Sequence, residues 1–189
     1  RTDLFLVQVP LVFIFLLGME LLIAQIYCKL IERRSLCSAL VSSNATAFNG
    51  KILFKASAWS AFSVIVMKSY VWAASALIEQ FKTLPLLDLP QWHYQNLDMP
   101  PYPVPFKFAL LAGMLAFNVF AEEIYFRGFL LERLKFLGKS AFLVNGVLFI
   151  LYHVFQARVS YPLLPFGILV SGYYAIFRNV LGAMLVHLM

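Results

Sequence analysis

The chain alternates between long apolar runs and short polar segments, and the lengths of the runs predict membrane-spanning helices. A helix needs about 20 mostly apolar residues to cross the hydrocarbon core of a bilayer. We assign a span to each of the apolar runs at residues 4–26, 56–81, 106–134, 140–156, 163–177 and 180–189. The pattern therefore predicts an all-α fold, a polytopic membrane helix bundle of about six transmembrane helices with the last one truncated at Met189.

The composition supports this interpretation. Hydrophobic residues make up 62% of the chain and charged residues 13%, with a mean hydropathy of +0.82. Soluble domains have about 45–50% apolar and about 25% charged residues. We conclude that the chain is an integral membrane protein and that the lipid bilayer is one of its partners.

The net charge of +6 does not indicate nucleic-acid binding, because the cations lie at the edges of the apolar runs. Cations in such places set the orientation of a membrane protein, and loops rich in Lys and Arg stay in the cytoplasm. Three such loops follow the first, third and fifth runs, and their main cations are Lys29, Arg33, Arg34, Lys51, Lys55, Arg133, Lys135, Lys139 and Arg178. We expect these loops to be cytoplasmic and the Pro-rich segment 82–105 to lie outside, in a bacterial plasma membrane.

Ionisable residues inside the runs are informative, because each costs about 2.5–3.5 kcal/mol at the centre of a bilayer. Glu20 and Lys68 each stand alone in their runs, and we interpret them as an ion pair or as residues near the interface. Glu123 and Arg127 are four residues apart, so on a helix they share a face and can pair. Glu122 projects about 100° away from Glu123 and is left to face another group.

Two of the three histidines, His153 and His187, also lie inside apolar runs, whereas His93 lies in the Pro-rich segment. Two glutamates and two histidines inside one small bundle can activate water, bind a metal or relay protons. The sequence permits these four side chains to meet in one cavity, although they come from three separate runs.

Three motifs in order resemble those of the CPBP (CAAX protease and bacteriocin-processing) family of intramembrane proteases, also called the ABI family. The EExxxR motif corresponds to Glu122, Glu123 and Arg127, and the FxxxH motif to Phe149 and His153. The last motif is a His followed four residues later by Asn; His187 matches the His, and the Asn would fall beyond Met189. The resemblance covers residues 117–189. It divides the chain into residues 1–103, with the N-terminal helices and the Pro-rich loop, and residues 104–189, a CPBP-like catalytic bundle.

The resemblance implies an intramembrane endopeptidase that hydrolyses a peptide bond with a glutamate-activated water. By analogy Glu122 is the general base, assisted by His153. Glu123 and Arg127 support the site, and His187 stabilises the oxyanion of the tetrahedral intermediate. The implied partner is a peptide or protein substrate, either a CAAX-type C-terminal segment or a leader or bacteriocin-like peptide.

The cofactor stays open between none and a divalent metal such as zinc. Glu122, His153 and His187 are the candidate metal ligands. The family is labelled metalloprotease, and a metal-free glutamate mechanism has also been argued for it. The HExxH pattern of zinc proteases and the Glu-x-x-His pattern of di-iron bundles are both absent. We favour the metal-free mechanism.

Two other functions compete with proteolysis. The chain could be a non-catalytic membrane scaffold or a bacteriocin self-immunity protein of the same fold. A transporter with an intramembrane proton relay is disfavoured, because the sequence shows no inverted repeat.

Overall fold

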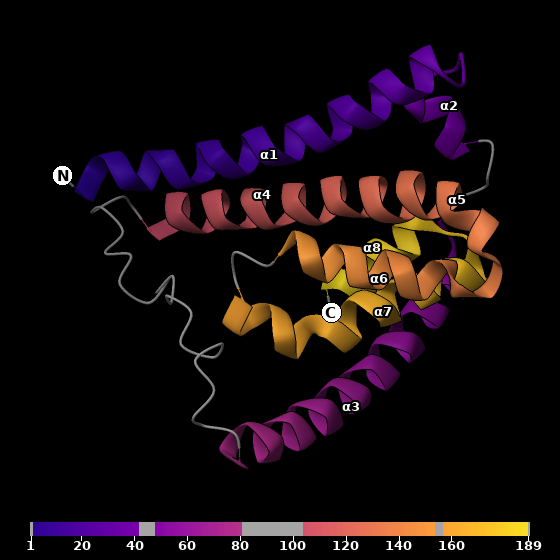
Figure 1. Cartoon of the computed structure of the whole chain (residues 1–189). Helices are drawn as coiled ribbons and strands as arrows, with labels where there is room; N and C mark the ends of the chain where they lie inside the picture. The colour runs from indigo at the N-terminus through magenta and orange to yellow at the C-terminus, as the bar shows by residue number, and fades with distance from the viewer. Residues whose placement is uncertain (1, 42–47, 81–103, 154–156, 189) are drawn as a thin grey trace.

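The computed structural model describes residues 2–41, 48–80, 104–153 and 157–188, and these residues form helices and short turns without a strand (Figure 1). This confirms the all-α prediction for the described part of the chain. Residues 82–103 of the Pro-rich segment, His93 among them, lie outside the described residues.

Each predicted apolar run falls on helical structure. The elements in chain order are α1 (Thr2–Leu30), α2 (Leu36–Val41), α3 (Gly50–Gln80), α4 (Val104–Glu122), the π-helix η3 (Glu123–Leu130), α5 (Leu131–Arg133), the 3₁₀ segment η4 (Leu134–Ser140), α6 (Ala141–Tyr152), α7 (Ala157–Phe177) and α8 (Val180–Leu188). The short helix α2 lies in a segment that the hydropathy pattern left as a polar connection.

Two described stretches are long and apolar enough to cross a membrane by length and composition, Gly50–Ala73 and Phe117–Tyr152. The second is not one straight helix. Gly138 has a positive φ of 60°, and the chain reverses direction there, so that α6 runs back alongside α4 and η3 (Figure 1). Pro165–Phe177 is a shorter apolar stretch. The count of about six spans stays a prediction.

The helices pack as a bundle in which α1 lies along α4, and α3 packs against α7 and α8 (Figure 1). Helices α6 and α7 approach each other closely, backbone to backbone. A Cβ atom at Gly146 would lie 2.7 Å from the Cα of Ile168, and one at Gly167 would lie 2.9 Å from the carbonyl oxygen of Gly146. Small residues let membrane helices approach this closely. This contact fixes the position at which α6 and α7 meet.

The predicted break between the fifth and sixth runs is present. Arg178 has a φ of 53°, which ends α7, and its amide donates a hydrogen bond to the Tyr174 carbonyl at 2.8 Å. The Asn179 side chain then caps α8, because its Oδ1 accepts a hydrogen bond from the Gly182 amide at 2.6 Å. A side-chain oxygen at this position satisfies a donor that the first turn of a helix leaves unpaired. The cap fixes the start of the helix that carries His187.

The bundle places polar side chains inside and many apolar ones outside. Charged and amide side chains are buried where α1, η3, α6 and α7 meet, among them Glu20, Glu122, Glu123, Arg127 and Asn145. The outer surface instead exposes large apolar side chains, including Phe15, Phe54, Ile65, Trp72, Leu115 and Leu151. A soluble monomer rarely exposes so much apolar surface, whereas a bilayer would cover it. The structure thus agrees with a membrane environment.

Candidate active site

The site is built around the π-helical segment Glu123–Leu130, which directly continues α4. Six of its eight residues are buried: Glu123, Ile124, Phe126, Arg127, Gly128 and Phe129. A π-helical turn widens the helix locally and is often found at functional sites. Here the segment brings two consecutive carboxylates and a guanidinium into the interior. The sequence pattern predicted a helix at these positions but gave no signal for the π-helical form.

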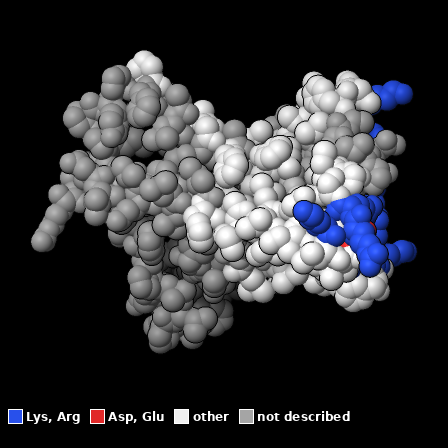
Figure 2. All heavy atoms as spheres, turned by 90° about the horizontal axis from the view of Figure 1, so that it is seen from above, with Lys and Arg blue, Asp and Glu red and all other residues white. Residues whose placement is uncertain are grey.

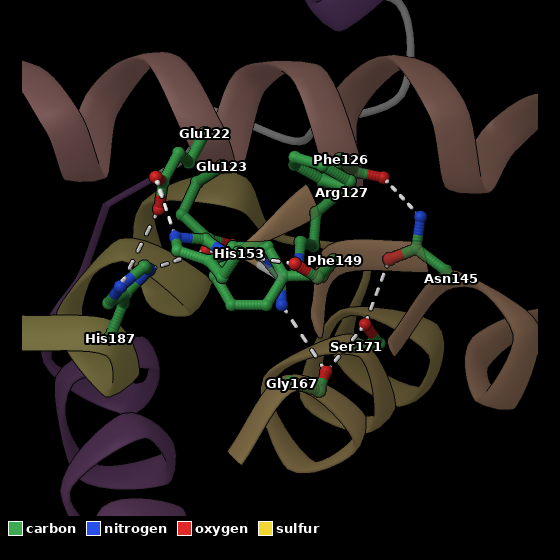
Figure 3. Close-up of polar contacts among 10 residues, drawn as sticks. All are labelled: Glu122, Glu123, Phe126, Arg127, Asn145, Phe149, His153, Gly167, Ser171 and His187. Carbon is green, nitrogen blue, oxygen red and sulfur yellow. Dashed lines mark hydrogen bonds and ion pairs between the residues drawn. The ribbon is translucent and has the colours of Figure 1, made fainter. Parts of the chain in front are cut away.

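Glu123 is fixed by two basic side chains (Figure 3). Its Oε1 atom accepts a hydrogen bond from Arg127 Nη1 at 2.7 Å and lies 2.8 Å from His187 Nδ1. Neither Glu123 nor Arg127 has any exposed side-chain surface. The predicted ion pair one helical turn apart is therefore present, and it also holds a histidine from α8.

Arg127 is fixed on its other side by α7 and α6. Its Nη2 atom donates to the Gly167 carbonyl at 3.3 Å, and its guanidinium lies 4.3 Å from the centre of the Phe149 ring. A guanidinium over an aromatic face gains a cation–π attraction, and more of it where water is excluded. Arg127 thus connects three helical elements around Glu123.

Glu122 points away from that pair and toward two imidazoles, as Figure 3 shows. Its Oε1 atom lies 3.4 Å from His153 Nε2, and its Oε2 atom lies 3.9 Å from His187 Nε2. Oε2 is buried and has no hydrogen-bond partner. The structure brings together all five predicted site residues, Glu122, Glu123, Arg127, His153 and His187, from α4, η3, the end of α6 and α8.

The orientation of His153 follows from its own helix. Its Nδ1 atom lies 2.8 Å from the Phe149 carbonyl oxygen, which can only accept a hydrogen bond, so Nδ1 carries a hydrogen. Nε2 is then the ring atom that faces Glu122. The Phe149 and Tyr152 rings pack against the imidazole, with ring centres 4.6 and 5.0 Å away. These contacts hold the imidazole next to the carboxylate.

His187 contacts both carboxylates. Nδ1 faces Glu123 at 2.8 Å, so Nε2 is directed into the space beside Glu122. Phe166 and Phe149 surround the ring, with centres 5.0 and 5.8 Å from it. Because the Glu123 carboxylate can only accept a hydrogen bond, Nδ1 of His187 carries a hydrogen, and the protonated ring carries a second one on Nε2. The protonated form of His187 can therefore present an N–H to a group that develops negative charge near Glu122.

A second polar network, which sequence reasoning missed, supports the π-helical segment. Asn145 donates from Nδ2 to the Phe126 carbonyl at 2.8 Å. Its Oδ1 atom lies 2.8 Å from Ser171 Oγ, which is also 2.8 Å from the Gly167 carbonyl. Asn145 and Ser171 are fully buried. An amide in the middle of an apolar run was the available signal, because a buried amide needs partners.

Glu20 differs from its sequence interpretation. Lys68 is exposed and forms no ion pair with Glu20, so the pairing of these two residues is wrong. Glu20 is instead 7% exposed on α1, and neither carboxylate oxygen has a hydrogen-bond partner. The Tyr152 hydroxyl approaches it, and Glu122 and His153 are close enough to act on its charge. The N-terminal helix therefore adds a third carboxylate beside the site.

The three candidate metal ligands, Glu122, His153 and His187, lie next to one another. Zinc requires ligand nitrogen atoms at about 2.0–2.1 Å from the ion and a tetrahedral set. In both imidazoles the Nδ1 atom is engaged, by the Phe149 carbonyl in His153 and by Glu123 in His187, and Nε2 faces Glu122. No group of three or more His, Cys, Asp or Glu side chains among the described residues is placed to hold an ion.

Residues 104–189 match the family model of the type II CAAX prenyl endopeptidase Rce1-like proteins. This match confirms the resemblance that the three motifs indicated, since the CPBP family includes these proteases. The matched segment begins at α4 and contains all five predicted site residues, whereas Glu20 lies outside it. Rce1-like proteins are membrane-embedded proteases. No curated protein and no solved structure matches the chain.

Proposed function

We propose that the protein is an intramembrane endopeptidase that hydrolyses a peptide bond with a water molecule activated by Glu122. One observation carries the proposal, namely a buried carboxylate oxygen that has no hydrogen-bond partner and lies 3.9 Å from one imidazole while its sister oxygen lies 3.4 Å from another. The match of the surrounding segment to a prenyl endopeptidase family supports it.

Glu122 and His153 together suit the activation of water. A water beside these two groups, within about 2.6–3.2 Å of both Glu122 Oε1 and His153 Nε2, would be oriented by both. The two atoms lie 3.4 Å apart, so this water would sit next to them and not between them. The carboxylate takes a proton from this water as its oxygen attacks the carbonyl carbon of the substrate. Glu122 then returns that proton to the nitrogen of the leaving amine, so the C–N bond breaks and a neutral amine departs.

His187 suits the stabilisation of the oxyanion. Its Nε2 atom faces the space beside Glu122, where a tetrahedral intermediate would form. Removing one such donor costs about 100- to 1000-fold in kcat in enzymes that use an oxyanion hole. Glu123 and Arg127 act on this step through His187, since Glu123 fixes the ring and Arg127 fixes Glu123.

The substrate class that we propose is a CAAX-type C-terminal segment carrying a prenylated cysteine, in line with the family's description. Leader or bacteriocin-like peptides are the second candidate substrates. We also propose that the six apolar runs cross a membrane. The described Lys and Arg side chains visible in Figure 2 gather at one end of the molecule, which would face the cytoplasm.

The substrate class can be tested with the protein reconstituted in vesicles and supplied with matched peptides. One peptide carries a prenylated cysteine in a CAAX sequence, the second lacks the prenyl group, and the third is a leader-type peptide. Mass spectrometry should show release of the residues after the cysteine from the prenylated peptide alone, with the Glu122→Gln variant as the inactive control. Cleavage of the leader peptide alone would show that leader or bacteriocin-like peptides are the substrates. A folded protein that cleaves none of the three would favour the scaffold hypothesis.

A further inference from the structure

A cavity of about 510 Å³ lies at the charged end of the molecule, away from the candidate active site. It is formed by η4, the start of α6 and the end of α7. Its apolar lining includes Leu131, Ala141, Phe142 and Ile176, and its cationic lining consists of Lys135, Lys139 and Arg178. A cavity of this size fits a small molecule or part of a lipid. The lining calls for a ligand with both an anionic and an apolar part.

The positive charge of the cavity is only partly compensated. Glu132 forms ion pairs with Arg178 and with Lys135. Lys139 has no ion pair with any carboxylate in the described ranges. Three cations and one carboxylate therefore leave two positive charges at the cavity, which favours an anionic ligand that can accept several charge-assisted hydrogen bonds.

The η4 segment has the features of a segment that binds the membrane surface. None of its side chains is buried, and Phe136, which is 81% exposed, stands between Lys135 and Lys139. Exposed aromatic side chains flanked by lysines favour the boundary between lipid headgroups and acyl chains. The positive φ of Gly138 makes the turn that holds Phe136 and both lysines on the outside. The cavity mouth thus lies where lipid headgroups would be.

An apolar strip leads away from the cavity along α6. Leu143, Val147 and Leu151 are exposed and follow one another at intervals of four residues, so they share one face of the helix. The strip begins at Leu143, directly after Phe142, which lines the cavity. A chain of methylene groups could lie along this face while a headgroup stays at the cationic mouth.

We propose that this cavity binds an anionic phospholipid, with its phosphate between Lys135, Lys139 and Arg178 and an acyl chain along the outer face of α6. Basic pockets between membrane helices bind phosphate-bearing headgroups in this way. The site is separate from the candidate active site. However, Arg178 directly precedes α8, which carries His187, and Glu132 follows the π-helical segment, so a bound lipid would join the two elements that hold the site.

Native mass spectrometry and thermal unfolding of the full chain, in micelles mixed with phosphatidylglycerol or with zwitterionic phosphatidylcholine, test the proposal. The Lys135→Gln/Lys139→Gln double variant removes two cations of the cavity. The Lys29→Gln/Lys51→Gln double variant is the matched control, because it removes two exposed cations that do not line the cavity. Inorganic phosphate without lipid forms a further arm.

We expect the wild-type and control proteins to retain phosphatidylglycerol in preference to phosphatidylcholine and to unfold at a higher temperature with it. The cavity variant should lose affinity for phosphatidylglycerol by about thirtyfold, given the usual contribution of each surface cation. Equal loss in the control variant would show that general surface charge attracts the lipid and would overturn the site. Equal stabilisation by inorganic phosphate would also overturn it. Because binding is measured without turnover, the result is independent of the proposed protease activity.

Discussion

Two glutamate–arginine pairs of the bundle lie in opposite surroundings. Glu123 and Arg127 have no exposed side-chain surface and are held by His187, Gly167 and Phe149. Glu132 and Arg178, at the charged end, retain 19% and 44% of their side-chain exposure, and Glu132 also pairs with Lys135. The residue types are the same, so the comparison isolates the effect of burial.

Burial changes what each pair can do. An exposed pair contributes about 0–1 kcal/mol, because water and salt screen it and long side chains lose freedom in forming it. Removing one partner of a buried pair leaves a desolvated charge, which costs about 3–5 kcal/mol. A buried pair is therefore held in one geometry, which is what positions His187. The exposed pair at the charged end can rearrange when a ligand arrives.

The largest change in stability should come from Arg127→Met, which leaves the Glu123 carboxylate in the interior without its guanidinium. We expect the free energy of unfolding to fall by about 3–5 kcal/mol. Unfolding in mixed micelles, followed by circular dichroism, measures this. A double variant Arg127→Met/Glu123→Leu should recover much of the loss, because it removes the unpaired charge. A loss below 1 kcal/mol in the single variant would contradict the buried pair.

Replacing Glu20 should stabilise the protein, in contrast to replacing Arg127. Glu20 is a buried carboxylate, and neither of its oxygens has a hydrogen-bond partner. Glu20→Leu should raise the free energy of unfolding by about 1–4 kcal/mol, as replacement of uncompensated buried charge by apolar groups often does. The same unfolding assay measures it, with Glu32→Gln just after α1 as the control. If Glu20→Leu destabilises the protein, Glu20 has a stabilising partner. The buried charge at Glu20 would then not differ from the paired charge at Arg127.

Asn145→Ala should have an intermediate effect. It removes the hydrogen bonds from Asn145 to Phe126 and from Ser171 to Asn145. Unsatisfied buried polar groups cost about 1–3 kcal/mol, so the melting temperature should fall accordingly. Ser171→Ala is the matched control and should cost less, because Asn145 keeps its bond to the π-helical segment. A larger loss in Ser171→Ala would show that α7 rather than the π-helical segment depends on this network.

The smallest effect is expected at the charged end. Arg178→Gln removes an exposed partner of Glu132, which keeps Lys135, so the free energy of unfolding should change by about 0–1 kcal/mol. Raising the salt concentration should reduce even that difference, because exposed charges are screened. A loss comparable with that of Arg127→Met would show that this pair is structural and would remove the contrast between the two regions.

The helices and the Glu123–Arg127 pair could be predicted from the sequence because each depends on local spacing. Apolar runs of sufficient length become helices, residues four apart share a helical face, and Arg178 with Asn179 interrupts the last run. The position of Glu20 could not be predicted, because its neighbours come from segments more than a hundred residues away.

The π-helical segment and the partners of Asn145 were also out of reach of the sequence, although an amide inside an apolar run indicates that some partner exists. A π-helical turn differs from an α-helical one by a shift in hydrogen bonding that composition does not encode. The network depends on how closely α6 approaches α7 at Gly146 and Gly167, and this approach is set by packing. The three motifs indicated which residues converge, and the packing then placed Glu122 beside both His153 and His187 and placed Glu123 beside His187 alone.

The most direct test makes the same type of substitution, Glu to Gln, once in each region and measures cleavage of the prenylated CAAX-type peptide by each variant. Glu122→Gln and Glu132→Gln each replace a carboxylate by an amide of the same size. We predict that Glu122→Gln lowers kcat/KM by at least about 100-fold, in the range that a general base contributes, with its unfolding transition retained. Glu132→Gln should stay within about twofold of wild type, as a substitution outside the site does. Full cleavage by Glu122→Gln, or an equal loss in Glu132→Gln, would contradict the assignment of Glu122 as the base.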